Sequence, residues 1–341
     1  MPVELPTRYG PLLAPGWDDD LIEGFLRRYG EWAWHEAAFI AALLPGQARV
    51  LDVGAYLGTF GLGLAVQRPL AFLCAVEANP ALTPLLAANL HRAPCPALAI
   101  EAMVAGAATA PRPGAAPPGN ASAASFAPDA PGVPTGPPVR AATLTELRAL
   151  HGPFDLIKLD AEGMEGEILQ ADADALRTGA TTLWVECNEE PRALALGALL
   201  LSWGLDLHYF AFPSHNLANH LGDPEPTFPW AYEAGLLAAP RTPPRLSPDL
   251  RRHHCQLRPI RTLPDLEEAM WRTPRWGMPD WPLDDPPALA ALAGRLIRNE
   301  ARDTFLRSGA PLGQPGNEMV WQRLLAAEQL LAKLGHPLPQ T

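Results

Sequence analysis

Short apolar runs recur through the first two thirds of the chain and alternate with segments that have helical periodicity. Continuous apolar runs are typical of strands in a parallel sheet, because helices cover both faces of such a sheet. The pattern predicts strands at residues 50–53, 71–76, 98–104, 154–160, 182–185, 205–212 and 235–239. The last of these is expected to form an antiparallel pair at the sheet edge.

Helices are predicted before, between and after these strands, at residues 18–29, 31–44, 84–91, 141–150 and 191–203. Regular alternation of strands and helices indicates an α/β fold with a doubly wound, mostly parallel, Rossmann-like sheet. We expect three parts: an N-terminal helical segment at residues 1–45, the α/β domain at 46–240, and a mostly helical C-terminal extension at 241–341, with helices at 287–307 and 318–334.

Residues 105–138 interrupt the domain with nine prolines among many alanines and glycines. Such a composition does not support a packed element, so the segment is predicted to be a long loop. A lid over the substrate and a disordered connection are both open interpretations.

A glycine-punctuated turn follows the first predicted strand. Asp52 ends the strand, Gly54 is expected to let the backbone approach a ligand, and Gly58 is expected to let the next helix pack on the sheet. The spacing Gly-x-x-x-Gly differs from the Gly-x-Gly-x-x-Gly of dinucleotide folds, which favours a ligand without phosphates. An ordinary strand-turn-helix junction is the alternative.

A second acid, Glu77, ends the next strand 25 residues after Asp52. An acid at about this distance binds ribose hydroxyls in nucleotide-binding α/β sheets. The pair suits S-adenosylmethionine, with Asp52 shaping the turn near the methionine ammonium and Glu77 holding the 2′ and 3′ hydroxyls. The neighbours Ala55, Tyr56 and Ala78 complete this part of the predicted cofactor site.

The third strand carries Glu101 and Met103, at the position where such a fold would contact the adenine. One residue of register decides which side chain faces the ligand. Before the first strand, Glu31, Trp32 and Trp34 are candidates to lie over the ligand turn, although packing is the simpler interpretation for the tryptophans.

Charged residues also end the fourth and fifth strands. Strand alternation places Lys158 and Asp160 on one face, and Glu186 follows the fifth strand. Because parallel strands bind ligands outside their carboxyl ends, Asp52, Glu77, Asp160 and Glu186 are expected to face one cleft.

The composition and net charge of the chain limit the classes of function that it can have. The chain of 341 residues is 48% hydrophobic and 18% charged, with a formal net charge of -11. This charge argues against nucleic-acid binding and favours a small or neutral substrate. The four cysteines are scattered, the N-terminus has no targeting pattern, and the apolar stretch 193–205 is too short for a bilayer, so a cytoplasmic protein without membrane contact is expected.

The order of motifs resembles the FkbM-type family of S-adenosylmethionine-dependent methyltransferases. The matching segments are residues 50–60, 76–80 with Asn89, 119–122, and 155–165, and the resemblance runs from about residue 30 to 240. Tyr56 departs from the family, which usually has Asn or a similar polar residue there. The resemblance implies O-methylation of a hydroxyl on a saccharide or natural product.

Methyl transfer to a hydroxyl needs an aligned acceptor and a route for its proton. Asp160 is the first candidate base or acceptor-orienting group, followed by Glu186 and His215; structural pairing of Asp160 with Lys158 is the alternative. Strand-end acids can also hold Mg²⁺, so metal dependence is open.

A second function is open as well. The protein could be a non-catalytic S-adenosylmethionine-binding or scaffold module that recruits a partner through its C-terminal helices, and those helices are also a candidate homodimer surface. An NAD-dependent dehydrogenase is disfavoured by the glycine spacing.

Overall fold

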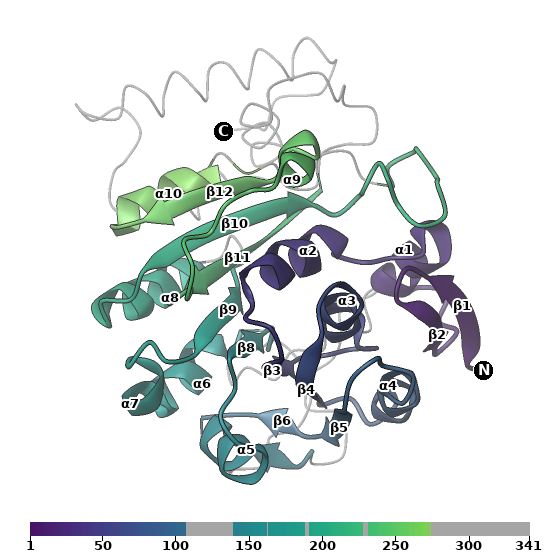
Figure 1. Ribbon diagram of the computed structural model, residues 1–341, viewed down its shortest axis with the longest axis horizontal. Helices are drawn as coiled ribbons and strands as arrows, with labels where there is room; N and C mark the ends of the chain where they lie inside the picture. The colour runs from purple at the N-terminus through teal and green to yellow at the C-terminus, as the bar shows by residue number, and fades with distance from the viewer. Residues whose placement is uncertain (107–138, 162, 188–190, 228–230, 272, 274–341) are drawn as a thin grey trace, which may run out of the picture.

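The structure is a computed structural model and describes residues 1–106, 139–161, 163–187, 191–227, 231–271 and 273. Its centre is an eight-stranded sheet with the order β12-β10-β11-β9-β8-β3-β4-β5 (Figure 1). These strands are β3 (Ala48–Val53), β4 (Leu70–Glu77), β5 (Ala97–Glu101), β8 (Leu156–Leu159), β9 (Thr182–Glu186), β10 (Leu207–Pro213), β11 (Tyr232–Ala238) and β12 (Gln256–Ile260).

The strands β9, β8, β3, β4 and β5 are all parallel. From β3 the chain moves outward through β4 to β5, and then returns to the other side of β3 for β8 and β9. The strand order therefore reverses between β3 and β8, which is the place where open α/β sheets form a ligand crevice. The predicted doubly wound, mostly parallel α/β fold is confirmed.

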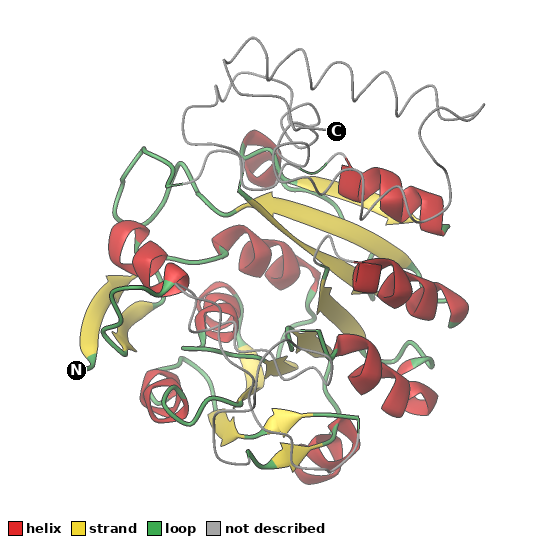
Figure 2. Cartoon of the chain, turned by 180° about the vertical axis from the view of Figure 1, so that it is seen from behind, coloured by secondary structure: helices red, strands yellow, loops and turns green. Residues whose placement is uncertain are grey.

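Helices cover both faces of the sheet, as the view from behind shows (Figure 2). One buried cluster joins the sheet to α2 (Trp34–Leu43), α3 (Thr59–Gln67), α4 (Thr83–Leu90) and α9 (Pro248–Arg252). The other joins it to α5 (Leu144–His151), α6 (Glu165–Ala171), α7 (Ala173–Leu176), α8 (Pro191–Ser202) and α10 (Leu263–Trp271).

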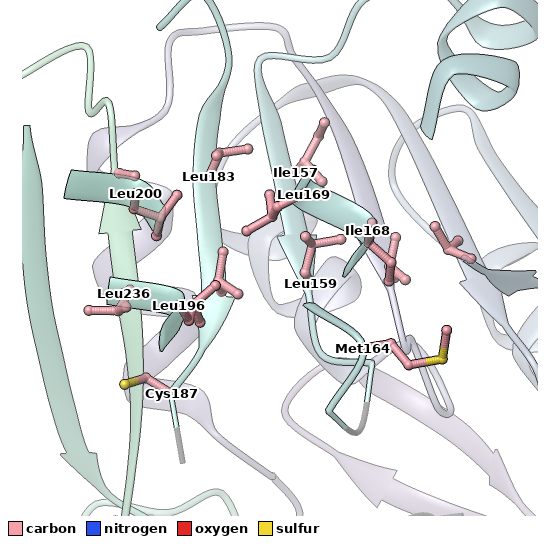
Figure 3. Packing of buried hydrophobic residues seen from close by; sticks show 14 of the residues in the cluster. Ile157, Leu159, Met164, Ile168, Leu169, Leu183, Cys187, Leu196, Leu200 and Leu236 are labelled. Atoms are coloured by element: carbon pink, nitrogen blue, oxygen red, sulfur yellow. The ribbon is translucent and has the colours of Figure 1, made fainter. Parts of the chain in front are cut away.

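The strand β8 shows why the central strands are apolar. All four of its residues are buried. Ile157 and Leu159 belong to the cluster that contains Ile168 of α6 (Figure 3), whereas Leu156 belongs to the cluster on the opposite face. The remaining residue is a lysine, which needs a charged partner at this depth.

The N-terminal segment contains more than helices. An antiparallel hairpin of β1 (Val3–Thr7) and β2 (Gly10–Ala14) precedes α1 (Leu21–Tyr29) and lies beside it (Figure 1). The prolines at positions 6 and 11 hid this hairpin, since proline is tolerated only in isolated or edge strands. The helix α1 begins after Asp20, whose side chain accepts the Glu23 N–H at 2.8 Å.

The predicted third strand, 98–104, is two strands. The ladder of β5 ends at Glu101, and the Ala102 N–H donates to the Glu77 carbonyl at 3.1 Å. A short strand β6 (Met103–Val104) then pairs in parallel with β7 (Ala141–Ala142) in a separate sheet. For this reason the helix predicted from residue 141 begins at Leu144, after the capping residue Thr143.

The strand predicted at the sheet edge is internal. β11 lies antiparallel between β9 and β10, and β12 forms the edge beyond β10. β12 was not predicted because it contains Pro259, which an edge strand tolerates. The predicted helices 287–307 and 318–334, and the predicted loop from residue 107 onward, lie outside the described residues.

Candidate functional site

A cavity lies at the carboxyl ends of β3, β4 and β8. Its walls are residues 53–56 with the start of α3, residues 76–79, residues 102–104, and four residues at and after the end of β8, namely Lys158, Asp160, Ala161 and Met164. The N-terminal part of the chain contributes Ile22, Trp32 and Glu36. The cavity holds about 960 Å³ of empty space, part of it open to solvent. A cavity at the carboxyl ends of parallel strands has the position of a small-molecule site.

The turn after β3 depends on two glycines, for reasons that differ from those predicted. A Cβ on Gly54, which has a φ of 74°, would lie 1.8 Å from the Asp160 carbonyl oxygen. The glycine therefore permits the turn to cross the end of β8, and not only a ligand to approach. Gly58 has a φ of 90°, and a Cβ built on it would lie 3.1 Å from the Leu86 side chain of α4. Gly58 does not line the cavity.

Glu77 lines the cavity with a fixed carboxylate. One of its oxygens accepts the Tyr56 N–H and the other accepts the Asn79 N–H, both at 2.8 Å. Burial raises the pKa of Glu77 to about 7, although these backbone hydrogen bonds oppose the shift. Each carboxylate oxygen has two acceptor sites, so both can still accept a ligand hydroxyl.

A buried lysine forms the floor of the cavity. The Lys158 Nζ lies 2.9 Å from Asp160 Oδ2 and 3.7 Å from Asp52 Oδ1. Burial acts to lower the pKa of Lys158, but the carboxylates of Asp160, Asp52 and Glu36 together raise it above its ordinary value. Lys158 is therefore charged at neutral pH and is held between two acids.

Asp52 lies beneath the cavity and does not line it. Its side chain is fully buried, and burial raises its pKa while the Lys158 ammonium opposes the shift. The structure pairs Asp52 with the lysine. The expected role of Asp52, shaping the turn near a methionine ammonium, stays a prediction.

Glu36 is the acid of the cavity that the sequence analysis missed. It comes from α2, and its carboxylate accepts the indole N–H of Trp184 in β9 at 2.5 Å. Burial raises the pKa of Glu36 to about 7, whereas Lys158 and the Trp184 hydrogen bond lower it. The signal in the sequence was a single acid at the start of an apolar helix, since residues 37–43 are all apolar.

The N-terminal segment is tied to the turn. The Tyr56 hydroxyl donates to Asp20 at 2.8 Å, at the start of α1. Of the three residues predicted to lie over the turn, Trp32 lines the cavity and packs edge-to-face on Phe25 at 4.9 Å. Glu31 instead forms an ion pair with an arginine, and Trp34 lies under the same guanidinium.

The structure brings most of the predicted cofactor residues to the cavity wall: Gly54, Ala55, Tyr56, Glu77, Ala78, Met103 and Asp160. Asp52 and Gly58 are not among the residues that line it. Glu101 is exposed at the end of the edge strand β5 and does not line the cavity, whereas Met103 belongs to the separate strand β6.

Two predicted catalytic residues lie outside the cavity wall. Glu186 ends β9 and pairs in register with Gly235 of β11. The His215 ring packs on Tyr29, with ring centroids 4.9 Å apart, and its Nε2 lies 3.2 Å from the Asp223 carbonyl. The expectation that four strand-end acids face one cleft holds for Glu77 and Asp160 only.

The described part of the chain contains no group of three or more His, Cys, Asp or Glu side chains placed to hold a metal ion. Its helices include none with the length and apolar character that a membrane span requires.

The raised pKa of Glu36 has a consequence for stability. Its pKa is about 7 in the fold and 4.5 ordinarily, so the native state binds this proton more tightly and stability falls as pH rises through that window. Buried histidines such as His35, with a pKa lowered to about 3, act in the opposite direction. We therefore compare wild-type with Glu36→Gln.

From pH 6 to pH 8, the free energy of unfolding of the wild-type should fall by about 1 kcal/mol more than that of Glu36→Gln. Urea unfolding at the two pH values measures this difference. An identical pH dependence in both proteins would show that Glu36 titrates normally.

No family model matches the chain, and no curated protein matches it. Among solved structures, the methyltransferase FkbM from Methylobacillus flagellatus is 15% identical with a TM-score of 0.37, covering 61% of this chain and 48% of that one. A TehB-like SAM-dependent methyltransferase from Corynebacterium glutamicum is 15% identical with a TM-score of 0.35, covering 63% and 92%.

A precorrin-6y C5,15-methyltransferase from Geobacter metallireducens is 13% identical with a TM-score of 0.35, covering 60% of this chain and 87% of that one. Similarities at this level show neither the family nor the activity of the chain.

Proposed function

We propose that the protein is an S-adenosylmethionine-dependent O-methyltransferase that acts on a hydroxyl of a saccharide or small natural product. The observation that supports it most is the Glu77 carboxylate. It is fixed by two backbone N–H groups and lines a cavity beside a glycine turn, at the point where the strand order reverses. This is the arrangement that binds a ribose in α/β sheets.

The residues present suit this cofactor. Glu77 would hold the ribose hydroxyls, the turn at residues 54–56 would hold the methionine end, and the apolar residues 102–104 would cover the adenine. When bound, the cofactor supplies an electrophilic methyl group on a cationic sulfonium. Acids outnumber bases in the lining, which favours a cation.

Asp160 is the proposed acceptor-orienting residue. Its carboxylate lines the cavity, is half-buried, and is held at one oxygen by Lys158. The other oxygen is available to accept a hydrogen bond from an acceptor hydroxyl and so to align it. Trp32 supplies an aromatic wall, which suits the apolar face of a sugar ring.

Two measurements test the function. Calorimetry with S-adenosylmethionine and with NAD should show binding of the first only. Release of S-adenosylhomocysteine is then followed with a panel of glycans and hydroxylated small molecules, and we expect turnover with at least one class. Binding without turnover on any acceptor would favour the scaffold module, and binding of NAD alone would overturn the proposal.

Asp160→Asn should separate orientation from cofactor binding. We expect turnover to fall at least tenfold while the affinity for S-adenosylmethionine changes less than threefold, because the amide keeps the shape but is a poorer acceptor. Steady-state kinetics and calorimetry on one preparation measure both quantities. An equal loss of affinity and turnover would reduce Asp160 to a structural partner of Lys158.

A further inference from the structure

The charges that line the cavity are unbalanced. Glu36, Glu77 and Asp160 line it with one cation, Lys158, among the lining residues described. A further acid, Asp52, lies behind Lys158 at 3.7 Å and takes part of its charge. The electrostatic field in the cavity therefore depends on whether each acid is ionised.

The strand order separates two of these acids. Glu77 ends β4, on one side of β3, whereas Glu36 is bonded to Trp184 of β9, beyond β8 on the other side. If Glu77 takes the ribose, Glu36 lies on the far side of the turn, toward the Lys158–Asp160 pair. It is therefore placed to act on the part of the ligand that is not nucleoside.

We propose that Glu36 is a specificity-determining residue that makes the cavity prefer the cationic S-adenosylmethionine to the neutral thioether product S-adenosylhomocysteine. This inference rests on the proposed function. The two ligands differ by one methyl group and one positive charge. A carboxylate near the sulfonium therefore discriminates between them by Coulomb attraction alone.

The surroundings of Glu36 make this preference sensitive to pH. It is faced by Lys158 of β8, by Asp160 after that strand, by Asp52 of β3, and by the Trp184 indole of β9. Its neighbour on α2, His35, contacts Pro213 and His253 instead. With a pKa of about 7, Glu36 is mostly neutral at pH 5.5 and mostly charged at pH 7.5.

Calorimetry with both ligands at pH 5.5 and pH 7.5 tests the proposal. In the wild-type, the ratio of the two affinities should shift toward S-adenosylmethionine by about fivefold as the pH rises. Titration of Glu77 over the same range acts on both ligands alike and leaves the ratio unchanged. In Glu36→Gln, the ratio at pH 7.5 should fall about tenfold and lose its pH dependence.

Glu77→Gln is the matched control, because it is the same chemical change in an acid whose pKa is also about 7. Glu77→Gln should lower the affinities for both ligands to a similar extent, since both carry the ribose. The ratio of the two affinities should therefore keep its pH dependence.

A spectroscopic measurement needs no ligand and no change at Glu36. The Trp184 indole N–H donates to Glu36, so its NMR cross-peak, assigned with Trp184→Phe, should titrate with a midpoint near 7. This readout and the wild-type ratio decide the question even where Glu36→Gln does not fold.

The outcomes separate the two proposals. If neither nucleoside binds the wild-type, the proposed function fails and this inference fails with it. If both bind with a ratio that is independent of pH, or that Glu36→Gln leaves unchanged, the inference alone is overturned.

Discussion

Gly54→Ala should lower the free energy of unfolding by about 2–4 kcal/mol and abolish binding of S-adenosylmethionine. The added Cβ would lie 1.8 Å from the Asp160 carbonyl oxygen, and the φ of 74° is unfavourable for alanine. Relief requires β3 and β8 to separate at the place where the cavity is built. Urea unfolding and calorimetry measure the two effects.

Gly24→Ala is the matched control. Gly24 lies exposed within α1, and nothing lies within 4 Å of a Cβ built on it. Alanine there should stabilise the protein by about 0.5–1 kcal/mol and leave ligand binding intact. A Gly54→Ala protein with wild-type stability and affinity would contradict the described contact between the turn and β8.

Lys158→Met should destabilise the protein by about 3–5 kcal/mol near pH 7.5. The lysine is buried beside a fully buried Asp52, and its removal leaves that carboxylate without a counter-charge. The free energy of unfolding from urea titrations measures the loss. An exposed pair such as Arg92–Glu4 provides the control, since Arg92→Met should change stability by less than about 1 kcal/mol.

The loss in Lys158→Met should depend on pH with a defined sign. Removing the ammonium raises the pKa of Asp52 further above its unfolded value, so the loss grows as pH rises and shrinks as pH falls. Adding Asp52→Asn to Lys158→Met should recover part of the stability. A loss that is constant with pH, or a double variant no better than the single one, would show that Lys158 acts by packing alone.

The central strands were predictable because a strand that is buried on both faces consists mostly of consecutive apolar residues. All four residues of β8 are buried, and three of them are apolar. Glu77 and the turn at Gly54 were predictable for a related reason, since in a parallel sheet the residue that follows a strand lies at the ligand edge.

Other features depend on contacts between distant segments. Glu36 reaches the cavity because α2 packs on Trp184, which is 148 positions away in the chain. The edge strand β12 is defined only by its partner β10. Glu186 was expected at the cleft because the antiparallel strand at 235–239 was predicted at the sheet edge, whereas β11 pairs directly beside β9 and opposite Glu186.

Register limited the prediction at the third strand. Glu101 and Met103 are two positions apart, yet the first is exposed and the second buried, because the chain leaves the sheet at Ala102. The hydrogen bond from Ala102 to the Glu77 carbonyl ends the ladder there. A period-two pattern does not show where a ladder ends.

The central claim is that the cavity beside Glu77 binds the adenosyl group of S-adenosylmethionine. A crystal structure of the protein grown with S-adenosylhomocysteine tests this most directly. We expect the nucleoside in the cavity, with its ribose hydroxyls within hydrogen-bonding distance of the Glu77 carboxylate and its adenine beside Met103. Nucleoside bound elsewhere, or a cavity that stays empty at saturating ligand, would contradict the account.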